Sequence, residues 1–503
     1  MILKALLPSS GDEPAILGPG AVPCSHRDLQ NQLAYTYRFL RQQGLGRDAC
    51  VAIISPPGSG AATLFLGVAN ACRCAPLNPS LVSTEIAFVL RDTCARVLIA
   101  GHGAPETALA AARDCGVPVL ATVPGARAGG WTFSQTPALS APSSDGPPQP
   151  GDIALYLHTS GTTARAKLVP ILYSSMVNST ESIVGGSGLR PDDCSLCIMP
   201  LFHVHGLIAA LLAPLAAGGR VWCAPGFQAD RFFAWLRESG ATWYTAVPTM
   251  HQAILLRSRH QTDLPRSHRL RFIRSCSAPL PVAVWTALRD TFGVPVVQAY
   301  GMTEAAHQIS STSLADQPEE TGSVGKSTGP RIAIMGEDGG LQPMGIRGEV
   351  VLSGASIIRR YESPPEANDA AFHDGWFRTG DEGYLDSAGN LRLTGRLKEL
   401  INAGGEKISP YEVEEALLSH AEVQEAVAFS MPHPLLGEAV ASAIVRKPQG
   451  EVTGPALRSW LRGKLAPHKV PRRIEVVDRL PMGVTGKLQR IGMASRLGLH
   501  EET

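Results

Sequence analysis

The sequence predicts an α/β protein with a large amino-terminal domain of layered sheets and helices, residues 1–395, and a small carboxyl-terminal α+β domain, residues 396–503. In the first part, short apolar strands such as Cys50–Ile54 and residues 96–100 alternate with helical segments, which is typical of layered α/β architecture. The second part has strands and helices of its own. A length of 503 residues is sufficient for two domains with sizeable cores.

The carboxyl-terminal unit follows a joint near residues 395–398. Residues 409–412 predict the start of a helix, because serine and glutamate occupy capping-box positions and proline takes the first helical position. The apolar stripe of that helix is Val413, Ala416, Leu417 and Leu418. We expect strands over 425–429, 440–445 and 474–477, and a second helix over 456–465.

Composition describes an ordinary globular protein and excludes several classes. Hydrophobic residues make up 44% and charged residues 18%, and the formal net charge of +1 gives no support for a nucleic-acid or membrane-surface partner. The ten scattered cysteines predict reduced thiols, and the CxxC at 194–197 predicts packing and no zinc site. The amino terminus lacks a leader pattern, and the apolar run at 207–217 is too short to cross a bilayer, so we expect a cytoplasmic protein.

The most informative segment is residues 158–167, which follow the apolar run 153–157 and predict a strand–loop–helix turn. Phosphate oxygens need many short donors and a cation held where the backbone can come close. The hydroxyl groups of Ser160, Thr162 and Thr163 and the charge of Lys167 supply these, and Gly161 removes a side-chain obstacle. No Gly-Lys-Ser/Thr closes the loop, so it is not the common NTPase P-loop. The alternative is a polar surface turn.

Four further motifs carry possible chemistry. Residues 300–304 place a threonine and a glutamate after an apolar segment, suited to a phosphate oxygen and to Mg²⁺, although a turn that caps a helix fits equally. Residues 376–381 present an aspartate suited to paired ribose hydroxyls. Residues 395–406 combine charges with a double glycine, and residues 481–487 place one lysine on a glycine-rich turn, which is usually no more than surface.

In this order the motifs resemble those of the adenylate-forming superfamily of acyl-CoA synthetases, free-standing peptide-synthetase adenylation domains and beetle luciferase. The resemblance runs from about Ser25 to Leu488. It implies a large amino-terminal domain of layered sheets and a barrel, followed by a small mobile carboxyl-terminal domain. It also implies ATP, Mg²⁺, coenzyme A and a small-molecule carboxylate as partners, with no nucleic acid and no membrane.

The resemblance implies the following nucleotide-binding roles. The β- and γ-phosphates would be held by Thr159, Ser160, Gly161, Thr162, Thr163 and Lys167. Thr303 would contact the α-phosphate and Glu304 would hold Mg²⁺, and both follow Tyr300 and Gly301 of the same nucleotide-binding motif. Asp381, with Arg396, would bind the ribose. Ser277 and Ala278 would lie beside the adenine. Lys487 would be the adenylation lysine. The loop carries Ala164, Ala166 and Leu168 where relatives commonly have Gly, Pro and Gly, a change we interpret as tuning.

A carboxylate that attacks a polyanion needs its charge neutralised first, so Mg²⁺, Lys167 and Lys487 would act around the departing pyrophosphate. In the second half-reaction the thiol of coenzyme A must enter the position that Lys487 occupied in the first. Rotation about a hinge at Lys398 would bring Gly404, Gly405 and Glu406 to line the pantetheine tunnel. We therefore expect two conformations, one per half-reaction.

The acid is suggested by local similarity to the oxalate–CoA ligase branch, in residues 302–308, 158–163 and 243–249. Residues 200–203 resemble the family segment whose histidine, His203, lies near the acyl carboxylate, and residues 244–251 mark the acyl-pocket helix that carries His251. A small dianion needs a second donor cluster, which His307, Ser277 and His203 could form. The alternative is that His307 packs on a helix after Glu304.

Two other functions share the ATP motifs. An adenylation enzyme that loads a carrier protein differs only in its acceptor; an amino-acid substrate is disfavoured because residues 243–251 contain no aspartate. A non-catalytic nucleotide-binding protein on the same fold is disfavoured because it would have little need for Lys487.

Overall fold

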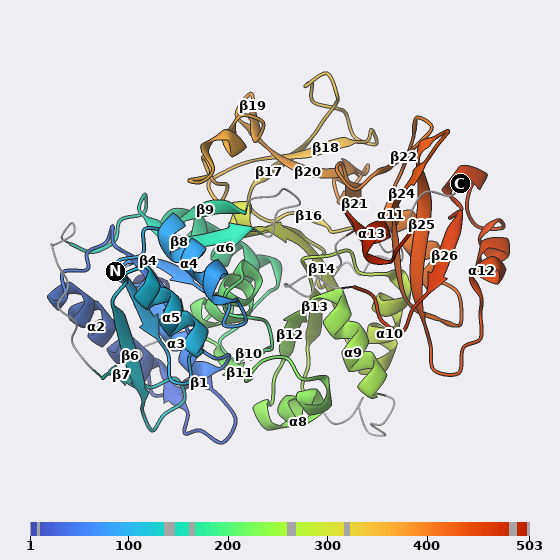
Figure 1. The fold of residues 1–503 in the computed structure, drawn as a ribbon. Helices are drawn as coiled ribbons and strands as arrows, with labels where there is room; N and C mark the ends of the chain where they lie inside the picture. Colours follow the sequence, from blue (N-terminus) through green and yellow to red (C-terminus); the bar gives the residue numbers. More distant parts are fainter. Residues whose placement is uncertain are drawn as a thin grey trace.

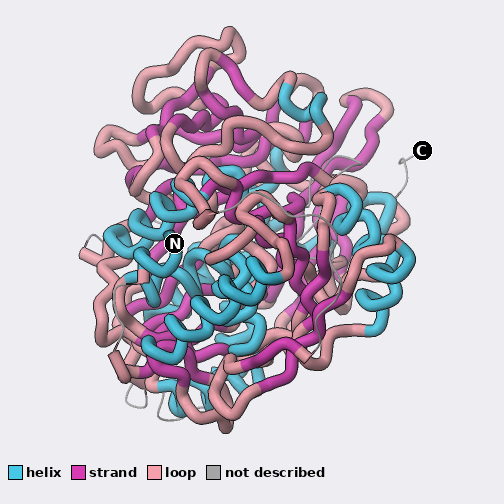
Figure 2. The backbone as a smooth tube through the Cα atoms, turned by 90° about the vertical axis from the view of Figure 1, so that its left-hand side faces the viewer, coloured by secondary structure: helices cyan, strands magenta, loops and turns pink. Residues whose placement is uncertain are grey.

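A computed structural model describes residues 2–7, 11–134, 146–159, 166–258, 268–315, 322–481 and 490–499. Its helices and strands build three large sheets before residue 397 and one after residue 400, and Figure 1 shows their arrangement. The α/β fold class is confirmed. In Figure 2 the helices gather around the lower layers, whereas the upper part is mostly strand and loop.

The first sheet has seven strands, of which β8 and β9 form an antiparallel hairpin at one edge. Its order is β7 (Trp131–Phe133), β6 (Val119–Pro124), β5 (Val97–Ala100), β3 (Cys50–Ile54), β4 (Arg73–Pro76), β8 (Ile153–Thr159) and β9 (Lys167–Leu172). The helices of this region are α1 (Ile2–Leu6), α2 (His26–Gln42), α3 (Ser59–Ala69), α4 (Ser83–Asp92), α5 (Glu106–Asp114) and α6 (Tyr173–Gly186). The central strands are buried along their whole length, as parallel strands covered on both faces must be.

The second sheet has nine strands and carries most of the candidate acyl site. Its order is β16 (Lys326–Ser327), β15 (His307–Ser311), β14 (Val296–Met302), β13 (Phe272–Ser275), β12 (Trp243–Ala246), β10 (Cys194–Cys197), β11 (Arg220–Cys223), β1 (Pro14–Leu17) and β2 (Cys24–Ser25). Its helices are the π-helix η1 (His205–Leu212), α7 (Ala213–Ala216), α8 (Ala229–Ser239), α9 (Pro248–Ser258), α10 (Val282–Phe292) and the 3₁₀-helix η3 (Thr303–Ala305).

The third sheet is antiparallel, and its long strand β20 (Trp376–Leu385) pairs with β18 (Gly348–Ser353), β19 (Phe372–His373) and β21 (Leu391–Arg396). The strand β17 (Arg331–Met335) pairs with β18, and the 3₁₀-helix η4 spans Pro365–Asn368. In Figure 1 this sheet lies above the first two.

The last sheet orders β23 (Glu406–Ile408), β22 (Ile401–Ala403), β25 (Gly437–Arg446) and β24 (Val423–His433), with β26 (Arg473–Val476) also paired to β25. Around it lie α11 (Pro410–Leu418), α12 (Gly454–Leu461), η5 (Pro467–Lys469) and α13 (Met493–Arg496). The strands and helices expected in this region are present, although α12 ends four residues early. Since β21 ends at Arg396 and β22 begins at Ile401, the chain leaves the third sheet over residues 397–400; the domain boundary at 395/396 stays a prediction.

Two local predictions were wrong. The candidate phosphate loop joins strand to strand, because residues 168–171 are buried and pair with β8, and the helix begins only at Tyr173. The capping box at 409–412 does not form: the hydroxyl of Ser409 donates to the carbonyl oxygen of Thr394, so it ties α11 to β21 instead of accepting from its own helix.

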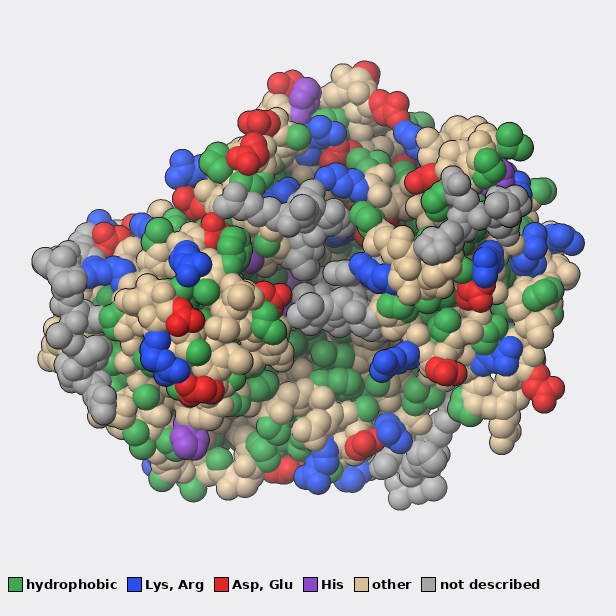
Figure 3. All heavy atoms as spheres, in the orientation of Figure 1, with side chains coloured by type: hydrophobic (Ala, Val, Ile, Leu, Met, Phe, Trp, Pro, Cys, Tyr) green, Lys and Arg blue, Asp and Glu red, His purple; other side chains and the backbone are tan. Residues whose placement is uncertain are grey.

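All ten cysteines are free thiols, and within the described ranges no three His, Cys, Asp or Glu side chains gather as a metal cluster. No helix among the described residues is long and apolar enough to cross a membrane. On the face drawn in Figure 3, basic and acidic side chains are interspersed, in keeping with the net charge of +1.

Candidate active site

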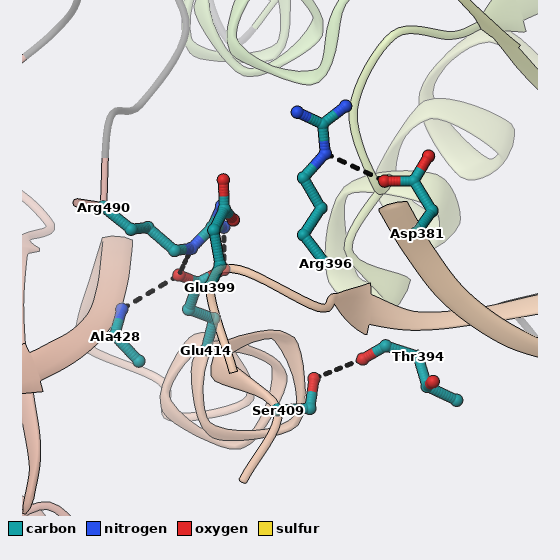
Figure 4. Close-up of polar contacts among 8 residues, drawn as sticks. All are labelled: Asp381, Thr394, Arg396, Glu399, Ser409, Glu414, Ala428 and Arg490. Carbon is teal, nitrogen blue, oxygen red and sulfur yellow. Dashed lines mark hydrogen bonds and ion pairs between the residues drawn. The ribbon is translucent and has the colours of Figure 1, made fainter. Parts of the chain in front are cut away.

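The candidate ribose site is a hydrogen-bonded triad that three strands bring together. The hydroxyl of Tyr300, near the end of β14, donates to Oδ2 of Asp381 at 2.5 Å. Figure 4 shows the other bond of Asp381, which Nε of Arg396 donates to Oδ1 at 2.9 Å. Asp381 and Arg396 face each other in the β20–β21 ladder, which sets this pair geometrically. The Asp381 carboxylate raises the pKa of Arg396, and burial raises the pKa of Tyr300 well above its usual value.

Glu304 and Lys167 both contact Tyr361, a residue that the sequence motifs did not identify. The Tyr361 hydroxyl donates to Oε1 of Glu304 at 2.8 Å, and Nζ of Lys167 lies 4.5 Å from the centre of the Tyr361 ring. Burial raises the pKa of Glu304 and lowers that of Lys167. The amide of Ile358 donates to the carbonyl oxygen of Glu304, which brings the segment that carries Tyr361 beside Glu304. Tyr361 belongs to no motif that the sequence alone would single out.

A phosphate-bound Mg²⁺ fits this donor set. Such an ion keeps several waters and needs only one or two protein carboxylates, so the single buried Glu304 is adequate without a metal cluster. Thr159 ends β8 and Lys167 begins β9, so the two face each other at the end of the hairpin where the chain passes from one strand to the other. Thr303 is half-buried at the start of η3. Ser160, Gly161, Thr162, Thr163 and Lys487 lie outside the described residues.

The candidate acyl site contains a buried polar cluster around Arg274, which is fully buried in β13. Its Nη1 donates to Oγ1 of Thr245 at 3.2 Å, and its Nη2 donates to Oε1 of Gln308 at 2.7 Å and contacts Nε2 of His307 at 3.1 Å. Burial lowers the pKa of Arg274. No carboxylate of the described chain forms an ion pair with it, so a buried cation here has neutral partners only.

His205, which the sequence motifs did not single out, contacts Ser277. The Nδ1 atom of His205 lies 3.0 Å from Oγ of Ser277, and its Nε2 lies 2.6 Å from Oγ1 of Thr245. Its ring stacks on that of His307 with centroids 5.0 Å apart. His203 is half-buried with its ring against Phe202, and its role in the pocket stays a prediction.

Glycine explains why His205 reaches this position. His205 begins the π-helix η1, and a Cβ atom at Gly206 would lie 2.1 Å from the carbonyl oxygen of Pro200. Only glycine allows that close approach, and π-helical turns are frequent at functional sites. The repeated histidine of residues 203–205, directly followed by glycine, was the signal available in the sequence.

The other predicted residues lie as follows. His307 is not on a helix: it begins strand β15 and has a φ of 102°. His251 is fully buried on α9 beside Tyr244, and burial lowers its pKa to about 3, so it packs as a neutral side chain. Ala278 and Lys398 are exposed.

Gly404 and Gly405 form the turn between β22 and β23, both with positive φ. Two such residues suit the tight hairpin turn that glycine favours, and the Gly405 amide donates to Oδ1 of Asn402 at 3.0 Å. Glu406 follows as an exposed residue of β23. The double glycine is therefore the tip of an exposed hairpin, as backbone that approaches a ligand would require.

Three non-glycine residues at the acyl cluster adopt left-handed backbone: Ser277, Ala306 and His307, with φ values of 74°, 51° and 102°. Such conformations cost roughly 1–3 kcal/mol each and persist only where the surroundings enforce them. The hydroxyl of Ser179 on α6 donates to the Ala306 carbonyl and accepts from the Gln308 amide, so it holds the backbone on both sides of His307.

Comparisons with known proteins agree with this geometry. The chain matches the family described as AMP-binding enzyme over residues 8–362 and the AMP-binding enzyme C-terminal domain over residues 412–487. It is 40% identical to a probable CoA ligase, CCL9, of Humulus lupulus over 500 residues, covering 97% of this chain and 94% of the relative. It is also 40% identical to an oxalate–CoA ligase of Arabidopsis thaliana over 461 residues, covering 90% and 89%.

A sulfoacetate–CoA ligase of Cupriavidus necator is 36% identical over 454 residues, covering 89% of this chain and 87% of that one. Among solved structures, ATP-bound MatB from Rhodopseudomonas palustris superposes with a TM-score of 0.87 at 26% identity, covering 98% of both chains. The likeness therefore extends over the amino-terminal sheets and the carboxyl-terminal unit together.

Proposed function

The chain belongs to the AMP-binding enzyme family, and from that premise we propose that its acid is oxalate or another small dianion. It is an ATP-dependent acid–thiol ligase that uses ATP, Mg²⁺, coenzyme A and a small-molecule carboxylate. The first half-reaction joins the carboxylate to AMP and releases pyrophosphate. The second transfers the acyl group to the thiol of coenzyme A.

The observation that carries the substrate proposal is Arg274, a fully buried cation with no carboxylate partner among the described residues. Burying an unpaired charge is costly, so a site that keeps one is suited to an anion that arrives with the substrate. One carboxylate of a dianion is activated at the phosphate, and the other needs donors a few ångströms away. Ser277 and His307 supply such donors, and His205 contacts Ser277. The relatives named for oxalate and sulfoacetate also act on small dianions.

For the nucleotide we propose the roles that the motifs imply. Tyr300 and Arg396 orient Asp381 toward the ribose hydroxyls, and Lys167 with Thr159 and Thr303 faces the phosphates. Glu304 holds Mg²⁺, which when bound neutralises phosphate charge. In this proposal Lys487 closes on the α-phosphate from the carboxyl-terminal domain, residues 396–503, and the hairpin at Gly404 and Gly405 replaces it when the domain turns about Lys398.

The test is a panel of acids, oxalate, malonate, sulfoacetate, acetate and benzoate, assayed for AMP release with and without coenzyme A. We expect the highest kcat/KM for oxalate or another small dianion and thioester formation only when the thiol is present. A preference for acetate or benzoate would contradict the substrate proposal without touching the family assignment. Rapid thioester formation on a carrier protein, and not on coenzyme A, would favour the carrier-loading alternative. Binding of ATP without release of AMP for any acid would favour the non-catalytic alternative.

Replacing His307 with alanine should impair use of a dianion more than use of a monocarboxylate, because the lost donor serves the second acidic group. We expect a loss of about 10²-fold in kcat/KM for oxalate and less than about tenfold for acetate. The control is His268→Ala, since the His268 ring bonds the carbonyl oxygen of Phe292 and the amide of Leu270, which do not belong to the cluster. If His307→Ala harms both acids alike, His307 is structural.

The raised pKa of Glu304 predicts a pH-dependent demand for Mg²⁺. Burial favours the protonated carboxyl, whereas Tyr361, Lys167 and Arg396 oppose this. Mg²⁺ binds the ionised form, so its apparent affinity should fall as the pH drops towards the raised pKa, at a higher pH than for an exposed glutamate. The measurement is the Mg²⁺ dependence of pyrophosphate exchange between pH 8 and pH 5.5.

ATP titrates in the same range, so Glu304→Gln, which cannot ionise, provides the reference profile for this measurement. The difference between the two profiles isolates the carboxyl group. Identical profiles for the two proteins would mean that Glu304 does not bind the metal.

A further inference from the structure

The direction of the hydrogen bonds in the acyl cluster follows from Arg274. A guanidinium has donors only and stays charged in proteins, so each group that it contacts must accept. Thr245 Oγ1, Gln308 Oε1 and His307 Nε2 are therefore acceptors of Arg274. The Arg274 Nε atom and Gln308 Nε2 have no hydrogen-bond partner within the described part of the chain, so the cluster contains more donors than it uses.

One branch passes through Thr245. Its hydroxyl oxygen accepts from Nη1 of Arg274 and lies 2.6 Å from Nε2 of His205, to which it can donate its single proton. With Nε2 as acceptor, the neutral His205 ring carries its proton on Nδ1 and donates it to Oγ of Ser277 at 3.0 Å. Ser277 accepts this bond, and its own hydroxyl proton is available to an anion.

The other branch ends at His307. Its Nε2 accepts from Nη2 of Arg274, so the neutral ring carries its proton on Nδ1. That nitrogen lies beside Gly301, because a Cβ atom at position 301 would come within 3.4 Å of it and within 1.9 Å of the His307 carbonyl oxygen. Glycine at 301 thus lets the strand that leads to Thr303 and Glu304 lie directly against this donor.

We propose that Arg274 is a positioning residue that sets both histidines as Nδ1–H tautomers and thereby turns His307 and Ser277 into donors for the second acidic group of the substrate. This inference rests on the proposed function for its substrate, but its hydrogen-bond pattern can be tested without any acid. The charge of Arg274 adds long-range attraction for the same group. Ser179 and the left-handed backbone at 306–307 hold His307 in place for this role.

The first experiment neutralises Arg274 while keeping its contacts. Gln308→Glu retains an acceptor for Nη2 but adds a negative charge, whereas Gln308→Met removes the acceptor and leaves the charge of Arg274 uncompensated. We expect Gln308→Glu to lower kcat/KM for oxalate relative to acetate by about tenfold or more, mainly through KM. We expect Gln308→Met to change both acids by the same factor. No change in discrimination with glutamate, or a loss of discrimination with methionine as large as the loss with glutamate, would overturn the role of the charge.

The second experiment observes the tautomers directly. In the full-length protein labelled with ¹⁵N-histidine, long-range ¹H–¹⁵N spectra at pH 8 without substrate should show Nδ1–H for both His205 and His307, assigned through His205→Gln and His307→Gln. Thr245→Val removes only the hydroxyl, and it should shift His205 towards the Nε2–H form while His307 stays unchanged. An Nε2–H tautomer for either ring in the parent protein, or an unaltered His205 signal in Thr245→Val, would overturn the proposal.

Folding and function are separated by the same set of measurements. Arg274→Lys keeps a charged donor and serves as the conservative variant; partial recovery of oxalate discrimination relative to Arg274→Met supports positioning by a cation. If the parent enzyme prefers a monocarboxylate while both histidines are Nδ1–H, the substrate proposal fails and the hydrogen-bond pattern stands. If it prefers oxalate while the tautomers are Nε2–H, the reverse holds.

Discussion

Lys487→Ala should reduce acyl-adenylate formation by about 10²–10³-fold and leave thioester formation from a supplied adenylate largely intact. The reason is charge: the α-phosphate gains negative charge as the acid attacks, and a lysine delivered by the carboxyl-terminal domain would stabilise that charge only in the first half-reaction. ATP–pyrophosphate exchange reports the first step, and coenzyme A acylation from synthetic adenylate reports the second.

The matched control is Lys464→Ala, because Lys464 is an exposed lysine of the same region that lies over the Trp460 ring. It should leave both steps unchanged. Equal losses in both half-reactions for Lys487→Ala would contradict the assigned role. Lys487 lies outside the described residues, so this role rests on its motif.

Arg490→Met should destabilise the carboxyl-terminal unit by about 3–5 kcal/mol, because it leaves buried carboxylates without their cation. Arg490 pairs with Glu414 on α11 through Nη2 at 2.7 Å and Nε at 2.9 Å, and with Glu399 through Nη1 at 3.0 Å (Figure 4). Its guanidinium also lies 4.5 Å from the centre of the Tyr411 ring. Chemical denaturation of the full-length protein measures the loss.

The loss should depend on pH, and its sign follows from Glu414. Burial already raises the pKa of this glutamate, and Arg490 opposes the rise. Without Arg490 the folded-state pKa rises further, so the destabilisation is largest at high pH and shrinks as the pH falls through that value, since protonation removes the unpaired charge. Arg490→Met combined with Glu414→Gln should recover part of the stability. A loss below about 1 kcal/mol, equal at pH 5.5 and pH 8, would contradict a buried ion pair.

These contacts give the carboxyl-terminal unit a defined attachment. Arg490 stands three residues after Lys487 and binds Glu399, the residue next to Lys398. The unit also touches the amino-terminal part, because the Val282 amide donates to Oε1 of Glu415 at 3.0 Å. A rotation about Lys398 would have to break the contact between Val282 and Glu415. It would keep the ion pair between Arg490 and Glu399, because both residues follow Lys398 in the chain.

Sequence reasoning succeeded where the determinants are local. The strands Cys50–Ile54 and Val97–Ala100 and the elements of the last sheet follow from apolar patterns and turn residues a few positions apart. It failed where a distant partner competes. Ser409 donates to Thr394 instead of capping α11, and residues 168–171 pair with β8 instead of beginning a helix. One alternative predicted His307 on a helix, but Ala306 ends η3 in a left-handed conformation and His307 begins strand β15.

What the sequence by itself determined is the class of reaction. Phosphate, ribose and thiol chemistry require particular residue types at short spacings, and motifs of this kind are present in the chain and indicate its family. What only the tertiary structure decided is the polar cluster at which we propose that the acid binds. Arg274, Thr245, His205 and His307 come from β13, β12, η1 and β15, and no spacing along the chain encodes their contacts. Burial and the parallel register of the sheet bring them together, because side chains from neighbouring strands meet only once the sheet has formed.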